Sequence, residues 1–359
     1  MTSYSKPTSK QINAAIPLLS SPQHEAYFFA RLENPHWIVP LAERGFFKYP
    51  PRAEHVQGGG VRFPTWPPSR YLARMATKAP TEVAAIFARI ETDNSFIIGD
   101  MLKAALAMPT DVAASLVPSV CRAVEAGTLW IHFKDASDLC VRLAKGGEPD
   151  AAMTLAEALF APTFEKGQEE PSRRDEYWYK EGLKKVVPVL AGVRARGFLP
   201  KLCDWLKASV EAKKHVDPDS GSDYSHIWRP AIEEHEQNRD YDFAGVLVGF
   251  VREGFEEAVG SGGLSLEEAL QIIERYPYLV FKRIRLHLVT EFADKHPGLA
   301  RHAMLDRSLF DDYQFKHEYA MLMGRRINLL SSEERDEWFG WINAGPDISD
   351  FDERTKKNL

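Results

Sequence analysis

Apolar residues recur along most of the chain at intervals of three and four positions, the spacing that places them on one face of a helix. One such stripe runs from Ala269 to Tyr276 and ends at Pro277, and a second follows from Phe281 to Phe292. Stripes of the same kind predict further helices at residues 22–33, 35–46, 69–78, 81–91, 96–107, 110–126, 135–145, 149–160, 176–197, 198–213, 241–259, 315–328 and 332–343. Alternation with a period of two is nearly absent, and "TLWIHF" at 128–133 is the one short segment predicted as a strand. The pattern predicts an all-α fold of about 15 or more helices.

Local start signals support these helices. Ser265 with Glu268, and Ser331 with Glu334, each fit a capping box. In such a box the serine oxygen accepts a backbone N–H of the first turn, and the glutamate bonds back to the cap. We therefore expect helices to begin at both serines.

A helix start led by proline recurs three times, in "APTEVAAIF", "MPTDVAASL" and "EPDAAMTL". Pro80, Pro109 and Pro149 precede an acid near the positive helix end and then a stripe rich in alanine and valine. Similar helix pairs that cannot bury their own faces are what a stacked solenoid needs. Over residues 22–343 the chain resembles a HEAT-like or armadillo-like α-helical repeat protein. The resemblance implies an irregular solenoid of helix pairs, a curved array; a compact non-repeat helical domain is the alternative.

Polar and turn-rich segments divide the predicted helices. The three longest are residues 47–67, 161–174 and 214–224, of which the last is the expected boundary between two arrays. The expected organisation is an N-terminal tail (1–21), an N-terminal helical-repeat array (22–215), a C-terminal helical array (225–343) and a charged C-terminal tail (344–359). That tail shows no capping repeat, which leaves open that the chain is a piece of a longer protein.

The segment 47–67 contains three consecutive glycines beside arginines and aromatics. "QGGGVRFP" lacks the lysine and the preceding strand of a phosphate-binding loop, and it does not lead into a helix as a dinucleotide fingerprint does. Its prolines and aromatics predict a packed connection without secondary structure of its own, in which the glycines supply the bend. Because long loops often carry function, we take Arg52, His55, Arg62 and Trp66 as candidate binding residues.

Composition narrows the classes of partner. The chain has 45 basic and 51 acidic residues and a formal charge of −6, so as a whole it does not attract nucleic acid or an anionic membrane. Cys121, Cys140 and Cys203 lie far apart in apolar surroundings, which is typical of reduced core thiols. There is no apolar run that fits a signal peptide or a membrane span. These features predict a cytoplasmic protein without membrane contact.

Catalytic and metal-binding signatures are absent from the sequence. The His-Glu pairs at His24, His235 and His317 lack the second histidine four residues on that a zinc protease helix requires. There is no Gly-x-Ser-x-Gly elbow. We therefore expect no cofactor, no metal and no catalytic centre. The enzyme alternative is a site that assembles from distant helices, with His287, Glu291, Glu318 and Asp311 meeting in a cleft.

The predicted function is that of a non-catalytic scaffold or recognition module, which presents a helical groove to a protein partner. Arrays of this class often serve in larger bacterial assemblies, including defence systems, and that is what the resemblance implies. Further candidate contact residues are the large aromatic and basic side chains Trp37, Trp178, Tyr179, Trp228, Trp338, Arg283 and Arg285. The alternative is contact with nucleic acid through basic pairs such as Lys184–Lys185 and Arg325–Arg326, which the net charge disfavours. The partner's identity and the oligomeric state stay open.

Overall fold

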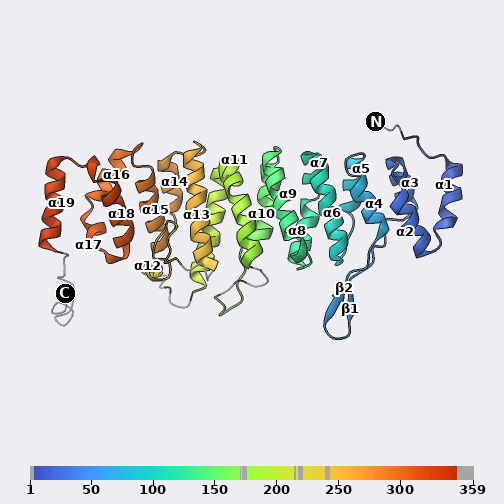
Figure 1. The fold of residues 1–359 in the computed structure, drawn as a ribbon, viewed down its shortest axis with the longest axis horizontal. Coiled ribbons are helices and arrows are strands. Elements are labelled where there is room, and N and C mark those ends of the chain that lie inside the picture. Colours follow the sequence, from blue (N-terminus) through green and yellow to red (C-terminus); the bar gives the residue numbers. More distant parts are fainter. Residues whose placement is uncertain are drawn as a thin grey trace. The chain divides into compact units, whose positions relative to one another are not determined.

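The structure, a computed structural model, describes residues 4–169, 171, 176–213, 216, 221–238 and 243–345, except for the side chain of Trp130. The predicted all-α fold is confirmed. Helices make up most of the described residues, and their one sheet consists of two short strands (Figure 1). Of these helices, none has the length and hydropathy needed to cross a membrane.

The chain forms two compact units. Unit 1 comprises Met1–Ala161 and Arg173–Arg194, and unit 2 comprises Pro162–Ser172 and Ala195–Leu359. The division falls inside α11 (Glu176–Glu211), where Arg194 has a non-helical backbone with φ −144° and ψ 35°. The units therefore separate at this kink, and not at 214–224 where the boundary was expected. Residues 346–359 of the predicted C-terminal tail lie outside the described residues.

Unit 1 contains the helices α1 (Ser9–Ala15), η1 (Ile16–Leu19), α2 (Pro22–Arg31), η2 (Pro35–Trp37), α3 (Ile38–Glu43), α4 (Pro67–Met75), α5 (Pro80–Phe87), α6 (Ser95–Ala107), α7 (Thr110–Ala114), α8 (Val117–Glu125), η3 (Trp130–His132), α9 (Phe133–Lys145) and α10 (Pro149–Phe160), where η marks a 3-10 helix. Helix α2 packs on α4, α4 on α6 and α6 on α9. A second series runs from α3 to α5 and from α5 to α7, and α10 packs against α8 and α9. Neighbouring helices thus bury each other's apolar faces in the order of the chain.

Unit 2 contains α12 (Ser225–Trp228), α13 (Phe243–Gly260), α14 (Leu266–Ile273), α15 (Leu279–Glu291), α16 (Pro297–Met304), α17 (Arg307–Asp311), η4 (Tyr313–Phe315), α18 (Lys316–Arg326), η5 (Ile327–Leu329) and α19 (Ser332–Ala344). Helix α15 contacts α12, α13, α14, α16 and α18. Ten of its 13 residues are buried, so it is the central helix of this unit. Two of the ten are Arg283 and His287, whose polar groups require partners in the core.

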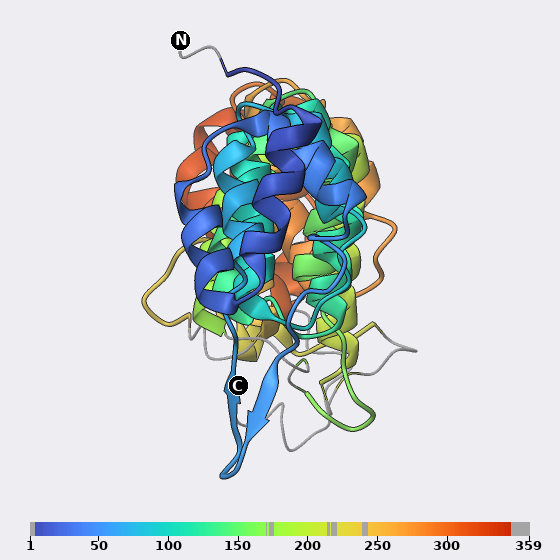
Figure 2. The same cartoon turned by 90° about the vertical axis from the view of Figure 1, so that its right-hand side faces the viewer.

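Segment 47–67 differs from the prediction because it contains a β-hairpin, with β1 (Glu54–Val56) antiparallel to β2 (Gly60–Arg62). Gly58 and Gly59 have φ of +100° and +90°, which glycine adopts without strain, and they form the tight turn. All strand residues are exposed, and Figure 2 shows the hairpin extending away from the helices of unit 1. Without a buried face, the strands have no apolar alternation for the sequence pattern to reveal.

One other prediction is wrong. Residues 128–133 form no strand but lead through η3 into α9, and the His132 ring packs so closely on Gly99 that a Cβ there would lie 2.4 Å from it. The segment predicted as the N-terminal tail contains α1, which buries Ile12. Thr8 and Gln11 form a capping box at its start.

Candidate functional site

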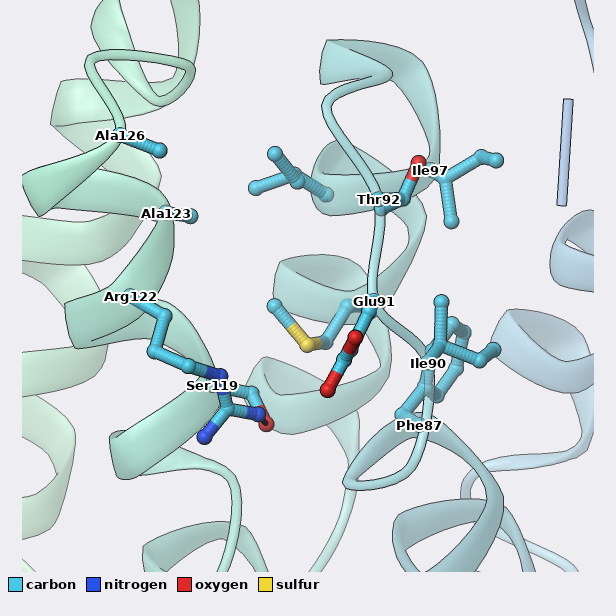
Figure 3. Close-up of a pocket in the computed structure, with 11 residues that line it drawn as sticks. Phe87, Ile90, Glu91, Thr92, Ile97, Ser119, Arg122, Ala123 and Ala126 are labelled. Carbon is cyan, nitrogen blue, oxygen red and sulfur yellow. Dashed lines mark hydrogen bonds between the residues drawn. The ribbon is translucent and has the colours of Figure 1, made fainter. Parts of the chain in front are cut away.

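A pocket of about 250 Å³ opens in unit 1 between the end of α5, the start of α6 and α8 (Figure 3). Its floor is apolar and mostly buried, and its rim carries polar groups. The lining residues are Phe87, Ile90, Glu91, Thr92, Ile97, Ile98, Met101, Ser119, Arg122, Ala123 and Ala126. An apolar cavity with a few convergent polar groups is the usual form of a binding pocket.

The connection between α5 and α6 is held in place by side-chain bonds. Asn94 caps α6 by accepting the backbone N–H of Phe96 at 3.0 Å. Its amide nitrogen also donates to the carbonyl oxygens of Pro51 at 3.1 Å and Pro64 at 2.8 Å. The base of the hairpin is therefore fixed to the start of α6, close to the pocket wall that Glu91 and Thr92 form.

Two opposite charges face each other across this pocket. Figure 3 shows Arg122 and Ser119 on one wall and Glu91 on the facing wall. The Arg122 guanidinium donates from Nη2 to Oγ of Ser119 at 2.8 Å. In the part of the chain that the structure describes, neither Arg122 nor Glu91 forms an ion pair, so both charges are available to a ligand.

A second pocket, of about 490 Å³, adjoins the first, and Ile90 and Glu91 line both. Its other lining residues are Ala42, Phe47, Lys48, Tyr49, Pro50, Arg52, Ile86 and Arg89. Tyr49 is 85% exposed, and the Arg52 side chain is 78% exposed with only a 4.0 Å contact to Asp93. We call the two pockets together the twin-pocket groove.

The residues that line the twin-pocket groove are mainly basic where they are charged, although the chain as a whole is acidic. Four of its lining residues, Lys48, Arg52, Arg89 and Arg122, are basic, whereas Glu91 is its one acid. The whole chain has a formal charge of −6. The local positive charge therefore favours a ligand with negative groups.

The four candidate binding residues of segment 47–67 lie in different surroundings. Arg52 lines the twin-pocket groove. His55 and Arg62 are exposed on the hairpin, where Nε of Arg62 pairs with Oε2 of Glu54 at 2.8 Å. Trp66 is only 7% exposed and lines a separate cavity of about 550 Å³ beside α4. The four are thus not parts of one site.

Most of the aromatic residues predicted as partner contacts have structural roles. Tyr179 is 1% exposed, and its hydroxyl donates to the Phe160 carbonyl oxygen at 2.9 Å, so it belongs to the core of unit 1. Trp228 is half-buried, and its Nε1 donates to the Asp223 carbonyl oxygen at 2.7 Å. Trp178 is 40% exposed, the largest exposure of these three side chains. The prediction of Tyr179 as a surface contact residue is therefore wrong, because its ring is packed in the core.

Arg283 is also buried and is not a surface contact residue. It forms a two-point ion pair with Glu318, with Nε at 2.9 Å from Oε2 and Nη2 at 2.7 Å from Oε1, and both side chains are 1% exposed. The guanidinium also donates to the carbonyl oxygens of Arg229 at 2.8 Å and Pro230 at 3.0 Å. Arg285, on the same helix, is exposed.

Two more arginines are buried among the described residues of unit 2, and they act in the same way. Nε of Arg229 donates to the Ala231 carbonyl oxygen at 3.0 Å, and Nη1 of Arg252 donates to that of Ile232 at 3.2 Å. Residues 229–232 form no helix or strand, so their carbonyl groups need other donors. The arginines supply these donors and stabilise the segment against α13, α15 and α18.

Glu233, His317 and Glu318 lie close enough to share a cation, with ligand atoms within 4.8 Å of one another. Both oxygens of Glu318 already accept from Arg283, and Nε2 of His317 lies 2.7 Å from Oε1 of Glu233. A bound cation would have to displace a buried guanidinium and lie beside its positive charge. The cluster therefore fits a structural ion-pair network better than a metal site.

The four residues of the enzyme alternative each have a different partner. His287 bonds Glu256 at 2.7 Å, Glu318 bonds Arg283, Glu291 pairs with Arg325, and Nε of Arg307 lies 2.6 Å from Asp311. The first three pairs link neighbouring elements of unit 2, and the fourth lies within α17. The geometry thus assigns the four residues packing roles.

The His317–Glu233 pair makes stability depend on pH. The hydrogen bond with Glu233 raises the pKa of His317. Burial is the largest single effect on Glu233 and raises its pKa, but the hydrogen bond from His317, a backbone hydrogen bond and the charge of His317 together outweigh burial and lower that pKa to about 2. The raised histidine pKa stabilises the fold below about pH 6.5, and this is lost as pH rises through the folded pKa. The lowered carboxyl pKa stabilises it above about pH 4.5, and this is lost as pH falls towards 2.

We therefore expect His317→Gln to destabilise the protein most between about pH 4.5 and about pH 6.5. The difference in free energy of unfolding from wild type should be larger at about pH 5.5 than at about pH 9. Urea titrations of both proteins at the two pH values measure it. A difference that is constant between them would show that the pair is not charged in the folded protein.

Comparison with known proteins assigns the chain to no family. No family model matches the chain, and the searches of curated proteins and of solved structures found no match. Function must therefore be inferred from the twin-pocket groove itself.

The sequence did not single out Lys48, Arg89, Glu91 or Arg122. Each is a charged residue near a helix end or in a connection between helices, and such residues normally face solvent. The available signal was the position of Glu91, at the end of the helix predicted at 81–91 and directly before the break that precedes the helix predicted at 96–107. Arg122 lies 31 residues further along and meets it only through the packing of α6 and α8.

Proposed function

We propose that the protein is a non-catalytic interaction module that binds an acidic segment of a protein partner in the twin-pocket groove. The observation that carries the proposal is the set of four basic side chains around two apolar pockets that meet at Glu91. Helical arrays expose such grooves between neighbouring helix pairs, so the HEAT-like pattern supports the same function. By that resemblance, the module would be a scaffold or recognition part of a larger bacterial complex, such as a defence system.

The first pocket suits an apolar anchor side chain. Its floor consists of residues such as Phe87, Ile97 and Met101, which are at most 6% exposed and present no charge. A leucine or phenylalanine side chain would bury apolar surface there. Arg122 at the rim would then donate hydrogen bonds to a carboxylate that flanks the anchor.

The second pocket suits acidic residues that follow the anchor. Lys48, Arg52 and Arg89 surround it, and Tyr49 offers an exposed ring for packing. Glu91 lies between the two pockets and would repel an acid at that point of the ligand. The groove therefore favours a segment with one apolar anchor, an uncharged residue beside Glu91 and acids on both sides.

Nucleic acid fits the described surface less well. The basic pairs predicted as phosphate contacts are largely neutralised: Arg326 pairs with Asp294 at 2.8 Å and Lys185 with Asp138 at 2.6 Å, and Arg325 pairs with Glu291. An apolar pocket floor also offers nothing to a phosphate group. We therefore place an acidic peptide in the groove and treat nucleic acid as an outcome of the test.

Fluorescence anisotropy with defined peptides tests the proposal. The probe is a labelled peptide with one phenylalanine flanked by glutamates, and its twin carries glutamine in place of each glutamate. We expect the acidic peptide to bind and Arg122→Glu to weaken it by about tenfold or more, since charge reversal replaces attraction by repulsion. Ala126→Trp, which adds bulk at a residue that lines the first pocket without a change in charge, should weaken both peptides.

Lys145→Glu is the matched control, because this exposed lysine of unit 1 lies outside both pockets and its replacement changes the net charge by the same amount. Its affinity for the acidic peptide should equal that of wild type. Equal binding by Arg122→Glu and Lys145→Glu would contradict the proposal. Tighter binding of a single-stranded oligonucleotide than of the peptide, lost in Arg122→Glu, would move the function to nucleic acid.

A further inference from the structure

A second apolar groove lies near the N-terminus of the chain, in unit 1, between η1 and α2. It has a volume of about 540 Å³ and is lined by Ala15, Leu18, Leu19, His24, Tyr27, Phe28, Arg31 and Leu32. Leu18 is 68% exposed and Tyr27 is 69% exposed, which is unusual for large apolar side chains side by side in one groove. We call it the N-terminal groove.

Helix α19, near the C-terminus of the described chain and in unit 2, has a half-exposed apolar stripe. None of its 13 residues is buried. One side is held by the Trp341 ring, 5.7 Å from Phe310, and by the ion pair of Glu334 with Arg301. Phe339 and Ile342 are 48% and 46% exposed, and their spacing of three residues places them on one stripe of the helix.

The charges of the two elements are complementary. The residues that line the N-terminal groove include Arg31 and His24 but no acid. The Arg31 guanidinium lies 5.9 Å from the centre of the Tyr27 ring, at the groove's apolar wall. Helix α19 carries the acids Glu333, Glu334, Asp336 and Glu337 against the single base Arg335. An acidic helix with an apolar stripe therefore matches a basic, apolar groove.

We propose that α19 of one molecule binds in the N-terminal groove of a second copy of this chain. The contact joins two different surfaces, so each pair still has one groove and one helix unused, and association continues into open chains or closes into a ring. A 13-residue helix is about 20 Å long, which makes this a small interface with weak, concentration-dependent binding. The contact is independent of the twin-pocket groove.

Sedimentation equilibrium over a range of concentrations tests the proposal. The weight-average mass of the wild type should rise above the 40.6 kDa monomer as concentration increases. Leu18→Glu, which puts a charge in the groove, and Phe339→Glu, which puts one on the helix stripe, should each remain at the monomer mass. Both side chains are exposed, so neither replacement disturbs the core.

Mixing the two variants gives the decisive result. The Leu18→Glu chain retains an intact α19 and the Phe339→Glu chain retains an intact groove, so their equimolar mixture should form one-to-one dimers and nothing larger. A wild type that stays monomeric, variants that associate like wild type, or a mixture that stays monomeric would each overturn the proposal. Arg122→Glu should associate like wild type, which separates this contact from peptide binding.

Discussion

Replacing Arg283 by alanine is expected to lower the free energy of unfolding by about 3–5 kcal/mol. The guanidinium donates to both oxygens of Glu318 and to the carbonyl oxygens of Arg229 and Pro230, all inside unit 2. Both side chains of the pair are 1% exposed, so removal of the guanidinium leaves the Glu318 carboxylate buried in the core. Of the present hydrogen-bond donors to this carboxylate outside Arg283, the Ile232 N–H remains. An unpaired buried charge is among the costliest defects in a protein core.

Urea denaturation followed by circular dichroism measures this loss, with Arg285→Ala as the matched control. Arg285 is exposed on the same helix, so its replacement should change stability by less than about 0.5 kcal/mol. The double variant Arg283→Met, Glu318→Leu removes both charges and should be less destabilised than Arg283→Ala. A loss below about 1 kcal/mol for Arg283→Ala would mean that Glu318 is not a buried charge.

Replacing Phe160 by alanine is expected to lower the free energy of unfolding by about 3–5 kcal/mol, in this case through unit 1. The ring is fully buried and packs edge-on against Phe133 and Tyr179, with ring centres 5.6 Å apart in both pairs. Gly182 makes room for it, since a Cβ there would lie 2.8 Å from the ring. Phe160 thus joins α9, α10 and the first part of α11, and its loss leaves a cavity that three helices cannot close.

The matched control is Tyr177→Ala, two residues from Tyr179. Tyr177 is 65% exposed, so its loss should change stability by less than about 0.5 kcal/mol. Chemical denaturation of both variants gives the comparison. Equal midpoints for the two variants would show that the end of α10 is not packed as described.

The helices could be predicted because their apolar stripes are a local property of the sequence. Segment 149–160 coincides with α10, and the capping boxes at Ser265 and Ser331 form as expected. The break predicted between residues 197 and 198 is a kink at Arg194 within one long helix. Helix α1 could also have been found, since Thr8 and Gln11 carry the same capping signal.

The polar core and the twin-pocket groove could not be predicted, because both depend on residues far apart in the sequence. Arg283 meets Glu318, 35 residues away, and in the sequence both resemble the charged residues that cover most helix surfaces. Arg122 and Glu91 come together only through helix packing. Periodicity reveals which face of a helix is buried but not which charges two helices bring together.

The central claim is that the twin-pocket groove selects an acidic segment with an apolar anchor. Selection of a displayed library of random peptides against wild type, followed by measurement of how the enriched peptides bind Arg122→Glu, tests it most directly. We predict enrichment of peptides with one leucine, methionine or aromatic residue among aspartates and glutamates, and loss of their binding to Ala126→Trp. Enriched peptides without acidic residues, or peptides that bind wild type and Arg122→Glu equally, would contradict the account.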